Sequence, residues 1–224
     1  MRSFVGAVAF LGLAACPPST DPIPAGGTEM TQFFNFKANR VQSWEFVNLS
    51  SDYGYALFAD MSDVIEEVPE GQVYSVLWEI DCRSSGVECI SGPSHTVKWR
   101  STEGQGVFIT ELVQEDGTSR VFEPPLTIAA EEMNPGEIVE TITAGATWTS
   151  TYNGFEDCPI RMTGEWDGAC VRFTVSDGDA DPLTNPELTG DIWGIRNFNL
   201  VGFRRESDSD NWEMSSYVCE GDEC

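Results

Sequence analysis

Apolar and polar side chains alternate along much of this 224-residue chain. In the run 95–102, Val97 and Trp99 fall on one side of an extended segment, and in 170–176 Phe173 falls on one side with the valines that flank it at alternate positions. A period of two is what a strand with one buried face produces. Helical periodicity is weak. The pattern therefore predicts an all-β protein with little helix.

Runs rich in aromatic and β-branched residues, bounded by turn signals, are the predicted strands. They cover 41–49, 53–61, 73–81, 95–102, 106–114, 119–126, 137–143, 146–152, 160–166, 170–176, 192–207 and 211–218. The last two are expected to form a hairpin across Ser-Asp-Ser-Asp. About twelve strands at this spacing favour an antiparallel sandwich, a barrel or a strongly curved sheet. The best short-helix candidate is 61–68, with Ser62 or Asp63 as its cap.

The N-terminus begins with the single positive charge of Arg2 and then runs apolar from Phe4 to Ala15. This run is shorter than the roughly 20 residues that a spanning helix needs. A charged start, a short apolar centre and small residues before a break are typical of a secretory signal peptide. We therefore expect residues 1–15 to be a signal for export.

The end of that run, Leu13-Ala14-Ala15-Cys16, resembles the lipobox of bacterial lipoproteins. In that class the cysteine thiol receives a diacylglycerol, and signal peptidase II cleaves just before it. The resemblance implies a mature chain that starts at Cys16 and is held on a membrane by its acyl chains. Pro17 stands where enteric bacteria read aspartate as inner-membrane retention, which implies the outer membrane. The alternative is an ordinary signal peptide with an incidental cysteine.

Beyond the cysteine, residues 17–30 are rich in proline and have no periodic apolar pattern, which is typical of an extended tether. The expected organisation is a signal peptide over 1–15, a lipidated flexible tether over 16–30 and a single all-β domain over 31–224. The length is sufficient for one sizeable core.

The remaining cysteines are even in number once Cys16 is assigned to lipid, which suggests disulfides in an exported protein. Their spacing favours three sequential pairs, although other connectivities stay open: Cys82 with Cys89, Cys158 with Cys170, and Cys219 with Cys224. A zinc site is the competing interpretation. It is disfavoured because the chain has no Cys-x2-Cys pair and His95 is its one histidine.

Acidic side chains number 37 against 12 basic ones, which gives a net charge of −25 at pH 7. Such a surface repels phosphate backbones, so nucleic acid is not an expected partner. Within 176–191, Asp177, Asp179 and Asp181 stand at alternate positions, as carboxylates do in calcium loops. Pro182 and Leu188 break the EF-hand pattern. A calcium loop of another type and a solvated acidic loop are the two interpretations.

The sequence contains few candidate catalytic residues in a recognisable arrangement. A Ser-His-Asp arrangement would need His95, which we expect to be structural because it starts a strand. Glu79, Glu165 and Asp167 lie beside tryptophans and could act as paired carboxylates in glycoside hydrolysis. Trp166, at a predicted turn, is the candidate for non-catalytic sugar binding. Four other tryptophans lie in strand patterns and are expected in the core: Trp44, Trp78, Trp99 and Trp148.

A second resemblance covers two short segments. Phe34, Phe36, Trp44 and Phe46 resemble the aromatic opening of a loose group of uncharacterised bacterial lipoproteins, and 192–203 is similar to their late aromatic segment. Asparagines replace the proline and the glycine of that opening. The resemblance implies an anchored, β-rich envelope lipoprotein, and it supplies no catalytic residue.

These observations together predict a lipid-anchored, non-catalytic binding or structural module of the cell envelope. It would lie on the periplasmic or outer face of the outer membrane, with another envelope protein, a polysaccharide or an apolar ligand as its partner. No cofactor is expected other than calcium at Asp177, Asp179 and Asp181. The alternative function is a secreted-type hydrolase, such as a glycosidase with paired carboxylates.

Overall fold

In the computed structural model, the described backbone covers residues 28–34, 41–48, 55–61, 66–68, 71–82, 95–159, 169–177, 189–196, 199–205 and 211–220. Side chains are described over 29–34, 71–78, 95–159, 169–177, 189–196 and 201–204. Almost all of this chain is extended, in fifteen strands and one 3-10 turn, η1. The all-β prediction is therefore confirmed.

The bounds follow the predicted runs closely. The elements are β1 (Thr28–Glu29), η1 (Met30–Phe33), β2 (Val41–Asn48), β3 (Tyr55–Met61), β4 (Glu66–Val68), β5 (Gly71–Cys82), β6 (His95–Thr102), β7 (Gly106–Gln114), β8 (Ser119–Ala130), β9 (Glu132–Met133), β10 (Ile138–Thr143), β11 (Ala146–Asp157), β12 (Ala169–Asp177), β13 (Gly190–Ile195), β14 (Asn199–Arg205) and β15 (Asn211–Glu220).

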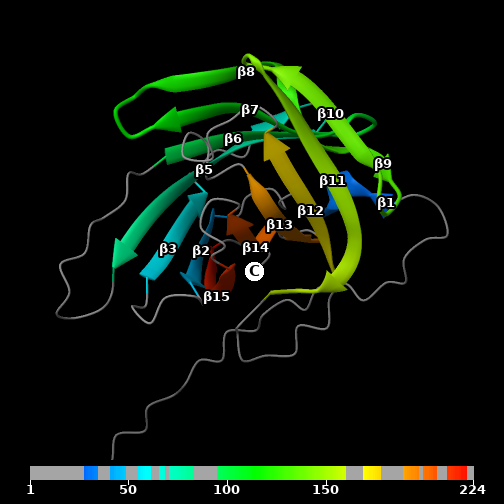
Figure 1. Ribbon diagram of the computed structural model, residues 1–224. Helices are drawn as coiled ribbons and strands as arrows, with labels where there is room; N and C mark the ends of the chain where they lie inside the picture. The colour runs from blue at the N-terminus through cyan, green and yellow to red at the C-terminus, as the bar shows by residue number, and fades with distance from the viewer. Residues whose placement is uncertain are drawn as a thin grey trace, which may run out of the picture.

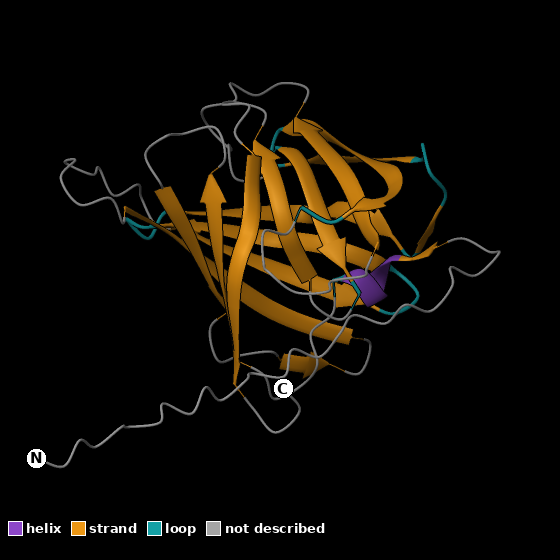
Figure 2. Cartoon of the chain, turned by 90° about the horizontal axis from the view of Figure 1, so that it is seen from below, coloured by secondary structure: helices purple, strands orange, loops and turns teal. Residues whose placement is uncertain are grey.

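Thirteen of the described strands form one antiparallel sheet in the order β10-β11-β12-β13-β14-β15-β2-β3-β5-β6-β7-β8, with β4 on β5. Strands β1 and β9 form a separate pair. The large sheet rolls around an interior, as Figures 1 and 2 show, so its two end strands β8 and β10 lie side by side. No ladder joins these ends within the described chain. Of the three expected architectures, the structure is the strongly curved sheet.

Burial alternates along the strands as the sequence predicts. Val97 and Trp99 of β6 are buried, as are Val171 and Phe173 of β12, while the residues between them are partly exposed. The alternation follows because the concave face of the rolled sheet is closed to water and the convex face is not. Two other tryptophans expected in the core are also buried, Trp78 and Trp148.

The helix predicted over 61–68 is wrong. Met61 ends β3, and Glu66–Val68 is a short strand that pairs with the start of β5 in a hairpin. Pro69 explains part of the difference, because a proline pushes the residue before it toward extended backbone. A helix of two turns also has too few internal hydrogen bonds to form without strong packing. Residues 62–65 lie outside the described residues.

The long run predicted over 192–207 is two strands. β13 ends at Ile195, β14 begins at Asn199, and these two residues pair in an antiparallel hairpin. A single strand of that length would exceed the typical strand by a wide margin. The final hairpin expected after it is present, with Gly202 of β14 opposite Glu213 of β15. The predicted strand 160–166 lies outside the described residues.

The N-terminal segment 28–34, which we call the plug, packs inside the rolled sheet. Met30, Phe33 and Phe34 of the plug are buried, and Phe34 is completely so. In Figure 2 the η1 turn lies at one end of the sheet. The tether predicted over 16–30 is therefore too long at its end, since residues 28–30 belong to the folded domain. The sequence does not mark this boundary, because residues 28–30 follow the proline-rich stretch without a strand pattern and their burial depends on strands far along the chain.

Aromatic contacts hold the plug in place. The Phe34 ring stacks on Trp99 with ring centroids 6.1 Å apart, and it meets Phe173 edge-on at 5.9 Å. The Tyr74 hydroxyl donates a hydrogen bond of 2.9 Å to the Phe34 carbonyl oxygen. A Cβ atom added at Gly194 would lie 3.0 Å from the Phe34 ring, so the backbone of β13 approaches the ring directly. Aromatic side chains from the plug and from β5, β6 and β12 thus pack together in the interior.

Candidate functional site

Two clusters of hydrogen-bonded and ion-paired side chains lie on the convex face of β11–β14, next to a disulfide. Cys158 and Cys170 are bonded, with an S–S distance of 1.98 Å and Cα atoms 5.0 Å apart. This is one of the three pairs expected from spacing. Glu156 lies opposite Cys170 in the ladder, so the bond shares a face with Glu156. The disulfide therefore links the end of β11 to the start of β12, beside the polar side chains of this face.

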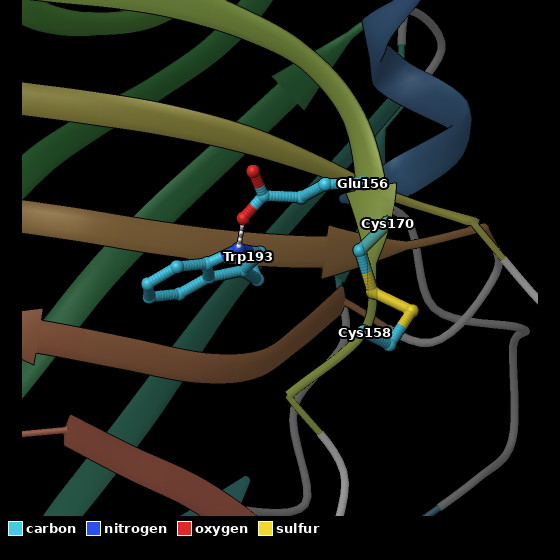
Figure 3. The surroundings of a disulfide bond; sticks show 4 residues. All are labelled: Glu156, Cys158, Cys170 and Trp193. Carbon is cyan, nitrogen blue, oxygen red and sulfur yellow. Dashed lines mark hydrogen bonds between the residues drawn. A yellow bond between two sulfur atoms is a disulfide. The ribbon is translucent and has the colours of Figure 1, made fainter.

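Trp193 and Glu156 lie beside that disulfide, as Figure 3 shows, and Arg172 completes their cluster. Arg172 alternates with the buried Val171 and Phe173, which places Arg172 and its ladder partner Trp193 on the convex face. The Trp193 indole N–H donates to a Glu156 carboxylate oxygen. The other oxygen of that carboxylate lies 3.4 Å from Arg172 Nη1. One carboxylate thus joins three neighbouring strands.

A second polar cluster lies one step along the same strands. Asp191 is only 4% exposed, and Thr174 Oγ1 donates to its Oδ1 over 2.5 Å. The Arg204 guanidinium donates to Oδ2 of the same carboxylate in an ion pair. Asn153 Nδ2 completes the chain by donating to Thr174 Oγ1 over 2.8 Å. This cluster joins β11, β12, β13 and β14.

The chemistry of these two clusters follows from their partners. Each carboxylate, on Glu156 and on Asp191, has an arginine as its counter-ion. The buried Trp193 ring, 9% exposed, offers little surface for stacking on a ligand. The arrangement suits cross-strand stabilisation of a curved sheet and a polar outer surface.

The predicted calcium residues are only partly described. Asp177 ends β12 opposite Trp148, whereas Asp179 and Asp181 lie outside the described residues. Asp191, further along the same acidic stretch, is paired with Arg204 as described above. Within the described side chains, no three His, Cys, Asp or Glu lie close enough to hold a metal ion. Calcium binding at 177–181 stays a prediction.

His95 has a structural position. Its side chain is buried at the start of β6, and its ring lies nearly parallel to that of Trp78 with centroids 6.4 Å apart. The other sequence candidates cannot be placed, because they lie outside the described residues or have only their backbone described: Cys16, Cys82, Cys89, Cys219, Cys224, Glu79, Glu165, Trp166, Asp167, Phe36, Trp44 and Phe46.

Sequence reasoning missed an apolar feature on strands β8 and β10. Among the described residues the exposed large apolar side chains are Val121, Ile138 and Ile142, which are 59%, 64% and 68% exposed. Alternation in 137–143 would favour the isoleucines as the inner face. The structure instead turns Thr141 and Thr143 inward, where both are buried.

The inward threonine has a hydrogen-bonding role at the junction of β8 and β10, which we call the seam. The Thr127 backbone N–H donates to Thr141 Oγ1 over 3.2 Å, and Ser150 Oγ donates to the Ile128 carbonyl oxygen over 2.6 Å. Arg120 Nη2 also donates to the Ala144 carbonyl oxygen over 3.3 Å. Side chains thus replace ladder hydrogen bonds where the sheet meets itself.

Electrostatics near the seam is dominated by carboxylates. Glu137 accepts hydrogen bonds from the backbone and side-chain nitrogens of Asn134, which lowers the pKa of this carboxyl. Between β6 and β7, the Lys98 ammonium lies 2.6 Å from Glu111 Oε2, and this hydrogen bond lowers the pKa of Glu111. These groups therefore remain ionised to a lower pH than free carboxyls.

Comparison with known proteins identifies no family. No protein-family model and no curated protein matches the chain. One solved structure is similar, that of a Bacteroides fragilis protein described as an exported-protein candidate with a YmcC-like fold. It is 11% identical over 83% of this chain and 98% of its own length, with a TM-score of 0.44. Among the described residues, no helix is long and apolar enough to cross a membrane.

Proposed function

We propose that this protein is a lipid-anchored module of the cell envelope that binds or supports a partner and is not a catalyst. The observation that carries the proposal is the plug. Residues 28–34 pack in the interior of the domain and follow directly on the proline-rich segment that begins at Cys16. An anchor at Cys16 would then be joined to the best-packed part of the fold by a short tether.

The filled interior supports a binding role at the outer surface. Phe34, Trp99, Tyr152 and Phe173 contact one another through stacked and edge-on rings, and all four are buried. Small-molecule sites are concave and keep room for a ligand. Where its side chains are described, the concave side of the sheet is occupied by the protein's own aromatic rings, so we expect a partner to meet the convex face or the seam.

The anchor is tested by intact-mass measurement of the protein purified from envelope fractions. We expect a mature chain that starts at Cys16 and carries the mass of a diacylglycerol, with further acylation of its amine in a Gram-negative host. A Cys16→Ser variant should move to the soluble fraction. Its thermal unfolding should match that of the wild type, because Cys16 precedes the first strand, β1, in the chain.

The control is a second cysteine variant, Cys158→Ser, which removes a disulfide but leaves the lipobox unchanged. This variant should stay in the outer-membrane fraction after density separation. A mature N-terminus other than acylated Cys16 would contradict the proposal, as would a Cys16→Ser protein that still sediments with membranes after a carbonate wash.

A further inference from the structure

The exposed apolar side chains of the described chain gather at one place. Val121 lies on β8, and Ile138 and Ile142 lie on β10, the two end strands that meet at the seam. We call these three side chains the seam stripe. In Figure 1 the two strands run beside each other at the top of the molecule. Single exposed apolar residues are ordinary, but a group confined to one junction is typical of an interaction site.

Folding of the domain does not explain the stripe. Ile138 and Ile142 share the convex face of β10 with Glu140, while Thr141 and Thr143 take the buried side. Burial of the isoleucines in place of the threonines would remove more apolar surface from water. The chain therefore keeps branched apolar side chains in solvent on a strand whose orientation is set by the Thr141 hydrogen bond.

Charge around the stripe indicates the chemistry of what covers it. Glu140 lies between the two isoleucines, Glu137 precedes Ile138, and Glu123 is two residues beyond Val121. All three carboxylates are exposed. The nearest basic residue of β8, Arg120, is held over the Phe122 and Trp148 rings and donates to Ala144. The stripe is thus apolar with an acidic border, on a chain with a net charge of −25.

We infer that the seam stripe is the docking surface for an extended segment of another protein, one face of which alternates apolar side chains with Lys or Arg. The inference deepens the proposed function and rests on it. An extended segment places every second side chain on one face, so a sequence of the form apolar-x-basic-x-apolar meets Ile138, Glu140 and Ile142 in turn. The step from Ile138 to Ile142 spans about 13 Å of strand, the reach of a four-residue segment.

Two other occupants fit less well. A lipid surface would have to take Glu140 into the headgroup region between the two isoleucines, and burial of an unpaired carboxylate is costly. A second copy of the chain would bring its own Glu137 and Glu140 against the same carboxylates, and like charges in contact oppose association. A basic partner would instead be attracted electrostatically by each of these carboxylates.

The test uses fluorescence anisotropy with the full chain carrying Cys16→Ser and three labelled peptides of equal length. The probes are (Val-Ser-Lys-Ser)2, (Ser-Ser-Lys-Ser)2 and (Val-Ser-Glu-Ser)2. We expect (Val-Ser-Lys-Ser)2 to bind at least tenfold more tightly than either of the others. The double variant Ile138→Thr/Ile142→Thr should weaken its binding at least tenfold, to the level of (Ser-Ser-Lys-Ser)2. Thr keeps the β-branched shape at exposed positions, so the melting temperature should not change.

Two charge variants separate the stripe from general attraction to an acidic protein. Glu140→Gln should weaken (Val-Ser-Lys-Ser)2 binding about three- to tenfold and reduce its dependence on salt. Asp157→Asn, at the exposed end of β11 six residues beyond Thr151, the ladder partner of Ile138, removes the same charge away from the stripe and should leave the affinity within twofold. Glu140→Gln also leaves both isoleucines intact, so it tests the site even if the double variant folds poorly.

Three outcomes would overturn the inference. Undiminished (Val-Ser-Lys-Ser)2 binding by the double variant would place the peptide elsewhere, while leaving a binding role for the protein in place. Isoleucine-dependent binding to phosphatidylcholine vesicles without peptide binding would make the occupant a membrane. Isoleucine-dependent dimerisation in sedimentation would make it a second copy. None of these outcomes depends on lipidation, which the mass measurement tests separately.

Discussion

Apolar side chains are buried in the interior around the plug, whereas several are exposed at the seam between β8 and β10. Phe34 is completely buried among Trp99, Phe173 and the backbone at Gly194. Ile142, a residue of similar hydrophobic character, is 68% exposed on β10. The interior is held by close packing, whereas the seam is held by side-chain hydrogen bonds. The isoleucines of β10 therefore do not contribute to the core and stay on the outer surface.

The first prediction tests this contrast directly and has the largest expected effect. Phe34→Ala should lower the free energy of unfolding by about 3–5 kcal/mol, because it empties a fully packed aromatic site. Ile142→Ala is the matched control and should change it by less than about 0.5 kcal/mol, as is usual for surface positions. Both are measured by urea unfolding followed by tryptophan fluorescence. Equal losses for the two variants would contradict the comparison.

The sequence predicts the strands better than their faces. Turn signals and alternation locate most strands to within a few residues, and in β6 and β12 they also assign the buried face through Val97 and Phe173. In β10, for which the sequence analysis assigns no buried face, the two isoleucines are exposed. Thr141 faces inward and accepts a hydrogen bond from Thr127, a residue on another strand, and no local pattern contains that information.

The plug and the convex clusters were missed for the same physical reason. Phe34 is buried only because β6, β12 and β13 surround it, and these strands lie far along the chain. Trp193 gives no signal that it would donate to Glu156, since the pairing depends on a ladder of three strands. The disulfide between Cys158 and Cys170 was accessible from the sequence, because its partners are close in the chain.

The second prediction sharpens the comparison at the disulfide end of the convex face. The double variant Cys158→Ser/Cys170→Ser should lose about 2–3 kcal/mol of stability, because the bond closes a short loop in the unfolded chain. The loss should be absent when wild type and variant are compared under reducing conditions. A loss that persists there would mean that the serines themselves disturb the native packing.

The third prediction concerns the seam. Thr141→Val keeps the shape of the side chain but removes the acceptor for the Thr127 N–H, and it should cost about 1 kcal/mol. Hydrogen exchange of the Thr127 amide should become faster. Thr151→Val, on the partly exposed face of β11, is the control and should leave both quantities nearly unchanged. Unchanged exchange in Thr141→Val would show that the seam does not depend on this bond.

The smallest effect is expected at the Lys98–Glu111 ion pair on the outer face. Glu111 has a lowered pKa in the fold, so the stability it contributes is present above its unfolded pKa and is lost as pH falls through its folded pKa. Lys98→Gln should therefore be destabilised by less than about 1 kcal/mol at neutral pH, since the pair is partly exposed. The difference from wild type should vanish once the pH has fallen below the pKa of Glu111 in the folded protein. A constant difference would assign it to packing.

The plug also constrains the order in which the chain can mature. It is the earliest described segment, yet its contacts lie on strands that follow it by most of the chain, as far as Gly194. Contacts so distant form slowly, because a long loop must close before they contribute. The earliest described segment to be synthesised is therefore among the last to dock. Until β13 arrives, the aromatic lining of the sheet faces water, and this interval is when the protein is most exposed to aggregation.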